Sequence, residues 1–229
     1  MARLSIIMPV LDEGDGIAGA LDALAELRGL GVEVIVVDGG SHDATVQRAR
    51  QRADHVLSAP RGRALQMNAG AAKATGDVLL FLHADTRLPP EAERLVLDGL
   101  ARSAHQWGRF DVTIEGRHPM LGLVAVMMNL RSRVTGIATG DQAIFVKRDA
   151  FQVAGGFPEI PLMEDIALSK RLKHTGRPLC LRERAITSGR RWEAHGVFRT
   201  ILLMWRLRLA YFFGADPAAL ARRYRYDGG

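Results

Sequence analysis

Acidic residues stand directly after three apolar, β-branched runs, at the points where strands are expected to end. Asp12 and Glu13 follow the first run, Asp38 follows the second, and Asp85 follows a later one. Ligands of an open α/β sheet bind at the carboxyl ends of its strands. One carboxylate can accept hydrogen bonds from ribose hydroxyls, and another can hold a cation that neutralises two phosphates. Turn or cap chemistry explains each acid alone equally well, but the ordered set of three indicates a nucleotide site.

The expected strands and helices alternate in the first half of the chain, which is typical of a largely parallel sheet flanked by helices. The first half is predicted to contain strands at 4–10, 34–37, 55–58 and 78–82, and helices at 17–27 and 62–75. The less regular second half is predicted to contain a helix from about Pro90, a strand in 110–114, a helical stretch at 121–130, a strand at 143–146, a helix starting near Glu164, and strands near Leu179 and Ala185. We therefore predict an α/β fold.

The composition suits a compact, soluble enzyme. The chain has 229 residues, of which 48% are hydrophobic and 24% are charged, and this length can bury a substantial core. Cys180 is the single cysteine, so neither an internal disulfide nor a structural zinc cluster is expected, and a reducing cytoplasm fits. The first apolar run ends at Pro9 and is too short for a signal peptide. These features predict a cytoplasmic protein.

The formal net charge is +6, and many arginines follow Arg182. This bias favours anionic partners, namely sugar diphosphates, acidic lipid head groups or nucleic acid. The sequence has no homeodomain, zinc-finger or RNA-binding signature, so nucleic acid is not an expected partner. For most of these arginines taken singly, a solvated basic surface is the alternative.

The apolar segment 197–213 contains Arg199, Arg206 and Arg208, so it has no uncharged run long enough to span a bilayer. Arg199 and Arg206 share a helical face, whereas Arg208 points to nearly the opposite one. This stripe is imperfect for a helix in a membrane interface, and docking on the protein's own core is the expected arrangement. Peripheral contact with the inner face of the membrane stays open. So does a homo-oligomer formed through 121–130 and 197–213.

Several segments resemble glycosyltransferase family 2. They are Ser5–Glu13, Val36–Thr45, Asn68–Gly70 and Phe81–Thr86, followed by Gly155-Gly156-Phe157 and Glu164-Asp165, which are similar to the family's acceptor-side signature. Together the matches cover roughly residues 4 to 175. Three of the motifs are most similar to those of a bacterial subgroup named for its association with radical-SAM and selenium-domain proteins. They are Asp-Gly-Gly-Ser, His-Ala-Asp and the segment from Arg61 to Asn68.

The resemblance implies a GT-A fold and transfer of a sugar from a nucleotide-diphosphate donor, for which a UDP-sugar is the first candidate. It also implies direct displacement with inversion at the anomeric carbon. Asp85 matches the last acid of the family's Asp-x-Asp motif and would bind Mn²⁺ or Mg²⁺ with the two phosphates. Asp38 would contact the nucleoside. Asp165, with Glu164 beside it, would accept the proton of the acceptor hydroxyl. Favourable charge at a helix N-terminus is the alternative for this pair.

The resemblance also divides the single domain, residues 1–229, into a nucleotide-sugar-binding half at about 1–105 and an acceptor-side half with C-terminal helices at about 106–229. Asp141 and Gln142 are predicted to line the acceptor pocket. The residues predicted to contact the nucleotide sugar are Pro9, Glu13, Asp38, Arg63, Asn68, His83, Ala84, Arg191 and Trp192.

Three positions depart from the family pattern. His83 replaces the first acid of the motif, and since imidazole suits transition metals better than Mg²⁺, Mn²⁺ is preferred if His83 is a ligand; substrate contact or packing is expected instead. Gly39 stands where many relatives carry a second aspartate, which leaves the base preference open. Ser188 replaces the glutamine of the processive members' motif, so processive polymerisation is not expected. Arg191 is interpreted as a diphosphate clamp or as a plain surface arginine.

Two alternative functions are weighed against glycosyl transfer. Gly14–Gly19 matches G-x-G-x-x-G after a strand and before a helix, with Asp38 at the end of the next strand, as in NAD-dependent oxidoreductases. Asp12, Glu13 and Asp15 crowd negative charge where that pyrophosphate would lie, which argues against it. A non-catalytic nucleotide-sugar-binding protein is the second alternative.

Overall fold

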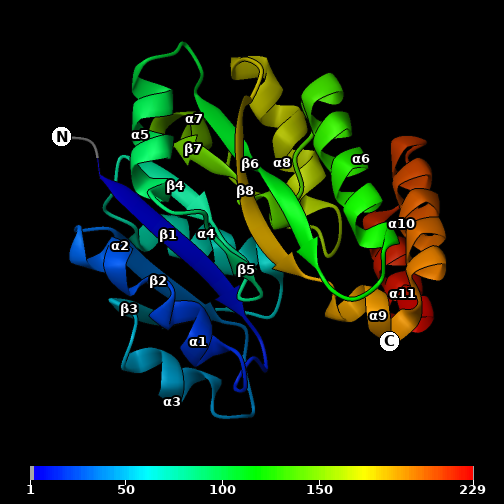
Figure 1. Ribbon diagram of the computed structural model, residues 1–229, viewed down its shortest axis with the longest axis horizontal. Helices are drawn as coiled ribbons and strands as arrows, with labels where there is room; N and C mark the ends of the chain where they lie inside the picture. The colour runs from blue at the N-terminus through cyan, green and yellow to red at the C-terminus, as the bar shows by residue number, and fades with distance from the viewer. Residues whose placement is uncertain (1–2, 229) are drawn as a thin grey trace.

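The computed structural model describes residues 3–228, except for the side chains of Arg191, His195 and residues 225–228. One eight-stranded sheet runs through the molecule in the order β3-β2-β1-β4-β7-β6-β8-β5 (Figure 1). The predicted α/β fold is confirmed.

The first four strands are parallel. They are β1 (Leu4–Val10), β2 (Glu33–Asp38), β3 (His55–Ser58) and β4 (Val78–Phe81), and β1 pairs with both β2 and β4 while β2 pairs with β3. Strands β1, β2 and β4 are almost fully buried, whereas β3 at the sheet edge is only partly buried. Their connections carry α1 (Ile17–Asp22), α2 (Ala25–Gly29), α3 (Thr45–Arg50) and α4 (Arg63–Lys73). The predicted helix 17–27 is therefore two short helices. Leu21, Leu24 and Leu27 are all buried across this break, so the apolar spacing still serves the core.

The second half of the chain adds strands in both directions. These strands are β5 (Thr86–Arg87), β6 (Trp107–Glu115), β7 (Phe145–Lys147) and β8 (Leu179–Ser188). β7 lies antiparallel between β4 and β6, β6 and β8 are parallel, and β5 is antiparallel to β8. The two strands predicted near Leu179 and Ala185 are one strand, whose pairing with β6 shifts register between Phe110 and Asp111.

The helices of the second half include several that the sequence pattern did not predict. Those missed are α7 (Arg148–Val153), α9 (Arg190–His195), α11 (Pro217–Gly228), and the short 3₁₀ turns η1 (Gly140–Gln142) and η2 (Lys173–Thr175). Those predicted, at least in part, are α5 (Ala92–Ala101), α6 (Met120–Thr135), α8 (Glu164–Leu172) and α10 (Val197–Phe212).

Two apolar layers cover the two faces of the sheet. Successive side chains of a strand point to opposite faces, so Ile6 and Met8 of β1 pack in the layer formed by α1, α2, α3 and α5. Ile7 packs in the other layer, which is formed by α4, α7 and α8. Burial on both faces explains why these strands read as continuous apolar runs. The sheet is thereby held rigidly between helices, with the carboxyl ends of β1, β2 and β4 at one edge.

Helices α6, α9, α10 and α11 gather at the far end of the molecule, beyond β6 and β8 (Figure 1). The expected docking of 197–213 on the protein's own core is seen for one face only: Val197, Thr200 and Leu207 of α10 are buried, whereas Phe198 and Leu202 are exposed. Within the part of the chain that the structure describes, every helix is too short or too polar to cross a bilayer.

Candidate active site

A cavity of about 630 Å³ opens at the carboxyl ends of β1 and β4. Its walls come from the loops after these strands, from η1, from the start of α8, and from α10 and α11. The predicted site residues that line it are Pro9, Glu13, Arg63, His83, Ala84, Asp85, Asp141, Glu164, Asp165 and Trp192. The fold therefore brings together residues that are up to 183 positions apart in the sequence (Pro9 and Trp192).

Asp85 lies in the turn between β4 and β5, and its side chain is exposed. The backbone of this turn is fixed, because Ser188 donates its N–H to the Asp85 carbonyl (3.1 Å) and β5 pairs with β8. Among the described residues, the carboxylate itself has only a long contact, 3.4 Å, from the hydroxyl of Thr86. A rigid turn thus presents a carboxylate whose oxygens are almost fully available to a ligand.

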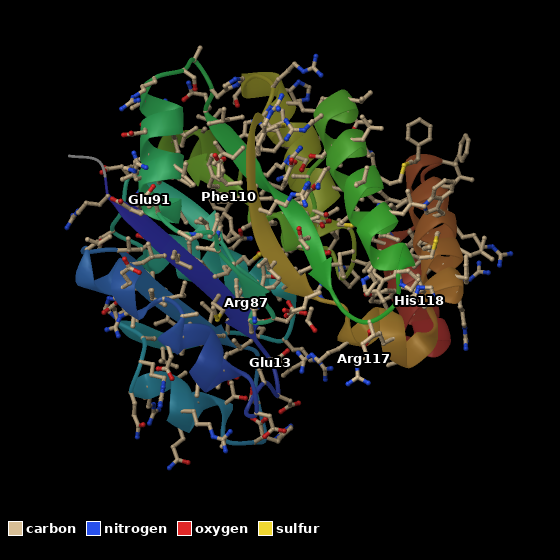
Figure 2. All side chains as sticks on the ribbon, in the orientation of Figure 1. Glu13, Arg87, Glu91, Phe110, Arg117 and His118 are labelled. Atoms are coloured by element: carbon tan, nitrogen blue, oxygen red, sulfur yellow. The ribbon has the colours of Figure 1, made fainter. Side chains whose placement is uncertain are left out.

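Glu13 follows β1 and lines the same cavity as Asp85, close enough for the charges of the two residues to interact (Figure 2 labels Glu13). Burial raises the pKa of Glu13, Arg190 opposes that rise, and the charges of Asp85 and Asp43 add to it. Arg190 Nη2 lies 3.9 Å from Glu13 Oε2. Two acids therefore lie near each other, and the nearest printed cationic partner, Arg190, is 3.9 Å from Glu13. Such an arrangement attracts a cation.

His83 packs against the turn that carries Asp141. Its Nδ1 lies 3.5 Å from Asp141 Oδ1, and its side chain is mostly buried. Gly140 makes this approach possible, since a Cβ at that position would lie 2.3 Å from His83 Cε1. The imidazole is thus packed against η1 and also lines the cavity, so both roles expected for it, substrate contact and packing, stay predictions.

The acidic residues at the strand ends fit a divalent cation only in part. Among the described side chains, no group of three or more His, Cys, Asp and Glu is placed to hold a metal ion. Mg²⁺ is usually bound by one or two carboxylates together with the oxygens of substrate phosphates. Asp85, with Glu13 nearby, fits a cation that is shared with a diphosphate and does not fit a metal held by protein alone.

Asp165 occupies the first turn of α8 on the other side of the cavity. Its Oδ2 accepts the N–H of Gly140 (3.0 Å), and its Oδ1 accepts the N–H of Ile166 (2.7 Å). Burial and the neighbouring Glu164 raise the pKa of Asp165 to about 6, against the opposing effect of these hydrogen bonds and of Arg63. Such a group is ionised at neutral pH and is a stronger base than an ordinary aspartate.

Glu164 and Arg63 connect the two sides of the cavity. Glu164 is buried, and its Oε1 lies 3.8 Å from Nη1 of Arg63, whose side chain is half exposed. Arg63 is the first residue of α4, and Glu164 is the first residue of α8. This ion pair therefore holds the starts of two helices from different halves of the chain close to each other.

Three predicted residues do not line the cavity. The Asp38 carboxylate is buried and accepts the N–H groups of Gly40 (3.0 Å) and Ser41 (3.1 Å) as well as the Ser41 hydroxyl. Asn68 donates to the carbonyl of Phe157 and accepts its N–H, both at 2.9 Å. Gln142 is buried and closes a capping box with Thr139. These three side chains fix loops around the cavity, and the ligand contacts expected of them stay predictions. The side chain of Arg191 lies outside the described residues.

The sequence pattern missed the inner face of α10. Thr200, Met204 and Arg208 line the cavity from this helix, and Tyr224 joins them from α11. The Nε atom of Arg208 is buried and has no hydrogen-bond partner among the described residues. The four-residue spacing of the three α10 positions puts them on one helical face, and this was the available signal.

The sequence pattern also missed Gln66, whose side chain links the ends of β1 and β2. Its Nε2 donates to the carbonyls of Val10 and Val37, each at 2.8 Å, from a fully buried position on α4. Those carbonyls lie at the ends of β1 and β2. The available signal in the sequence was a glutamine within an alanine-rich helix, and in the structure this helix packs over the strand ends.

Residues 5–120, just over half of the chain, match the family model described as Glycosyl transferase family 2. Among curated proteins, the undecaprenyl-phosphate 4-deoxy-4-formamido-L-arabinose transferase of Pseudomonas syringae is 33% identical over 99 residues. The alignment covers 38% of this chain and 29% of that protein. The similarity thus spans less than a third of this relative's length.

Solved structures share the fold at lower sequence identity. The mannosyltransferase PcManGT from Pyrobaculum calidifontis, in complex with GDP-Man and Mn²⁺, superposes with a TM-score of 0.67 at 20% identity, over 97% of this chain and 69% of that one. S. aureus TarS 1-349, in complex with UDP-GlcNAc, gives a TM-score of 0.65 at 18% identity, over 81% of this chain and 58% of that one.

Proposed function

The chain belongs to glycosyl transferase family 2 and has the GT-A fold, and on this basis we propose that it moves a sugar from a nucleotide-diphosphate sugar to an acceptor hydroxyl in the cavity described above. One observation carries the proposal. Asp85 and Glu13, at the strand ends, face the same cavity as Asp165, which belongs to α8 in the other half of the chain. A metal-binding carboxylate and a base are thus available on opposite sides of one site.

The side of the cavity formed at the ends of β1 and β4 is assigned to the donor diphosphate and is called the donor side. Asp85 would hold a divalent cation, Mn²⁺ or Mg²⁺, on this side, and Glu13 adds negative charge beside it. When bound, the cation stabilises the charge that develops on the departing diphosphate. Two similar structures contain UDP-GlcNAc, or GDP-Man with Mn²⁺, which supports this donor class. A UDP-sugar is the first candidate.

The acceptor side is assigned to Asp165. Its carboxylate accepts the proton of the acceptor hydroxyl as the oxygen attacks the anomeric carbon, which gives inversion in a single displacement. The raised pKa suits this transfer. The N–H groups of Gly140 and Ile166 each bind one carboxylate oxygen and hold the group at the cavity wall, and each oxygen keeps a lone pair for the acceptor hydroxyl. Without a glutamine at position 188, we propose a single, non-processive transfer for each acceptor.

Isothermal titration with UDP-, GDP- and dTDP-sugars, each with and without Mn²⁺, tests the donor assignment. We expect one nucleotide sugar to bind in a Mn²⁺-dependent manner, and Asp85→Ala to abolish that dependence. Asp98→Ala is the matched control, since Asp98 lies on α5 and pairs with Arg102 outside the cavity. Tight binding of NAD with no metal-dependent binding of a nucleotide sugar would overturn the proposal.

A non-catalytic binding protein is distinguished by turnover. A screen of the same donors, scored by release of nucleoside diphosphate in the presence of a cell extract as the acceptor source, should show release by the wild type. Donor binding without any release across the screen would favour the binding protein. Membership of the subgroup associated with radical-SAM and selenium-domain proteins stays a prediction from the sequence motifs.

A further inference from the structure

Exposed apolar side chains are concentrated on one end of the molecule. Of the thirteen large hydrophobic side chains that are exposed among the described residues, eleven belong to α6, to α10 or to the residue that follows α10. Their exposed fractions range from 48% to 77%. Leu30 and Val153 are the two elsewhere, and single exposed residues of this kind are ordinary. The eleven are Leu123, Val126, Met127, Leu130, Val134, Phe198, Leu202, Trp205, Leu209, Phe212 and Phe213.

On α10 these residues form a continuous stripe. Phe198, Leu202, Trp205, Leu209 and Phe212 recur at intervals of three or four residues, so they lie on one face of the helix. The opposite face is the one that packs on the protein and lines the cavity. The described chain therefore leaves most of this apolar stripe uncovered, with 59% to 72% of each residue exposed.

The exposed residues of α6 and α10 belong to the same surface. The two helices lie side by side in Figure 1, and Leu121 and Ala125 of α6 pack in one cluster with Val197 of α10. The rings of His118, just before α6, and Phe198 are 6.1 Å apart. We call the surface formed by the eleven side chains the α6–α10 face. Contiguous apolar surfaces of this kind mark sites of interaction with protein or membrane.

The charge on these helices selects the partner. The sequences of α6 and α10 contain no Asp or Glu. Of their five arginines, Arg133 is already paired with Asp111 (2.6 Å) and Arg131 is partly buried. Arg199 and Arg206 are exposed beside the apolar stripe, and Arg117 is exposed just before α6 (Figure 2). Arg208 does not interrupt the stripe, because it points into the cavity. Apolar residues with arginines at the rim match a bilayer that contains anionic lipids.

A second copy of the chain fits this surface less well. A two-fold interface pairs the same patch with itself, so Arg199 and Arg206 would lie near the arginines of the other copy with no carboxylate on either helix to neutralise them. We propose that the α6–α10 face docks on the surface of a bilayer containing anionic lipids, with its apolar side chains in the boundary below the head groups. The proposal does not depend on the proposed function.

Vesicle co-sedimentation of the full chain tests this. We expect binding to vesicles of phosphatidylcholine mixed with phosphatidylglycerol, weak binding to phosphatidylcholine alone, and release at high salt. The combined variant Phe198→Ser, Leu202→Ser, Trp205→Ser should bind the anionic vesicles at least about tenfold more weakly, because it removes apolar area from the stripe. The combined variant Leu30→Ser, Val153→Ser is the matched control and should bind like the wild type.

Circular dichroism and donor titration on the same variants keep the result interpretable, since the substituted residues are exposed and lie outside the cavity. Arg199→Glu with Arg206→Glu should lose binding to anionic vesicles while keeping its fold. Equal vesicle binding by the wild type and the triple variant would overturn the proposal, as would no binding by the wild type. A dimer in vesicle-free ultracentrifugation that the triple variant dissociates would assign the face to a second copy instead.

Discussion

The two sides of the cavity are built in different ways. On the donor side, β1, β2 and β4 come from the first 81 residues, run parallel, and deliver Glu13 and Asp85 from the loops that follow them. On the acceptor side, Asp165 is placed by a helix start, by the N–H of Gly140 and by a sheet whose strands arrive from distant segments. Under the proposed function, we expect donor binding to depend on the strand ends and turnover to depend on long-range packing.

Asp165→Asn is the variant expected to have the largest effect on this comparison. Removing the base should lower turnover by about 10²- to 10⁴-fold, while titration with the donor should give nearly unchanged affinity. Nucleoside diphosphate release is the assay, and Asp149→Asn, an exposed acid of α7, is the control. Normal turnover by Asp165→Asn would remove the base from the acceptor side.

The pH dependence of the same residue sharpens the assignment. Because the pKa of Asp165 is raised from 3.8 to about 6, turnover should rise with pH and level off above about 6, as the carboxylate ionises. The raised pKa also means that this group stabilises the fold below its unfolded pKa, and that the contribution is lost as the pH rises through the folded pKa. The Tm of the wild type relative to that of Asp165→Asn should therefore be highest at low pH and should fall as the pH rises through about 6. A constant difference in Tm across that range would contradict the assigned cause.

Asn68→Ala tests the contact that joins the two sides. The variant leaves the N–H and carbonyl of the buried residue Phe157 without their partner, which should lower the free energy of unfolding by about 1–3 kcal/mol. Urea unfolding is the measurement. Gln152→Ala, at an exposed position of α7, is the control and should have little effect. A loss as small as that of the control would show that the two sides are held together elsewhere.

Arg87→Ala should have the smallest effect. Arg87 Nη2 lies 2.9 Å from Glu115 Oε2, with both side chains more than half exposed, and Figure 2 shows Arg87 near the front of the molecule. An exposed pair of this kind contributes at most about 1 kcal/mol. Urea unfolding should show a small loss that high salt removes, and donor binding should not change. A large loss of donor affinity would mean that β5 positions Asp85 through this pair.

The strands on the donor side were largely predictable, because a strand that is buried on both faces has a continuous apolar sequence. The bounds predicted for β1 and β3 agree with the structure, and β4 is one residue shorter than predicted. The positions of Glu13 and Asp85 followed from the strand ends, and both residues line one cavity. The buried hydrogen bonds of Asp38 did not follow, since its partners Gly40 and Ser41 belong to a local turn that the apolar pattern does not describe.

The acceptor side was less predictable for physical reasons. β5 has two residues and β7 has three, which is too short for a periodic pattern, and both exist only through pairing with distant strands. The Glu164-Asp165 pair was found through its motif. Arg208 was missed because its role depends on which face of α10 is turned inward, and that orientation is set by packing on α8 and α11, outside the helix itself.

The position of β7 has a consequence for synthesis of the protein. β4 is fully buried and apolar, and one of its edges is paired only by β7, whose residues follow some 64 positions later (from Phe81 to Phe145). While the chain emerges from the ribosome, that edge stays open, and an open apolar edge is a template for aggregation. A fragment ending near residue 105 should therefore be insoluble, and the full chain should need chaperone protection until β7 has been made.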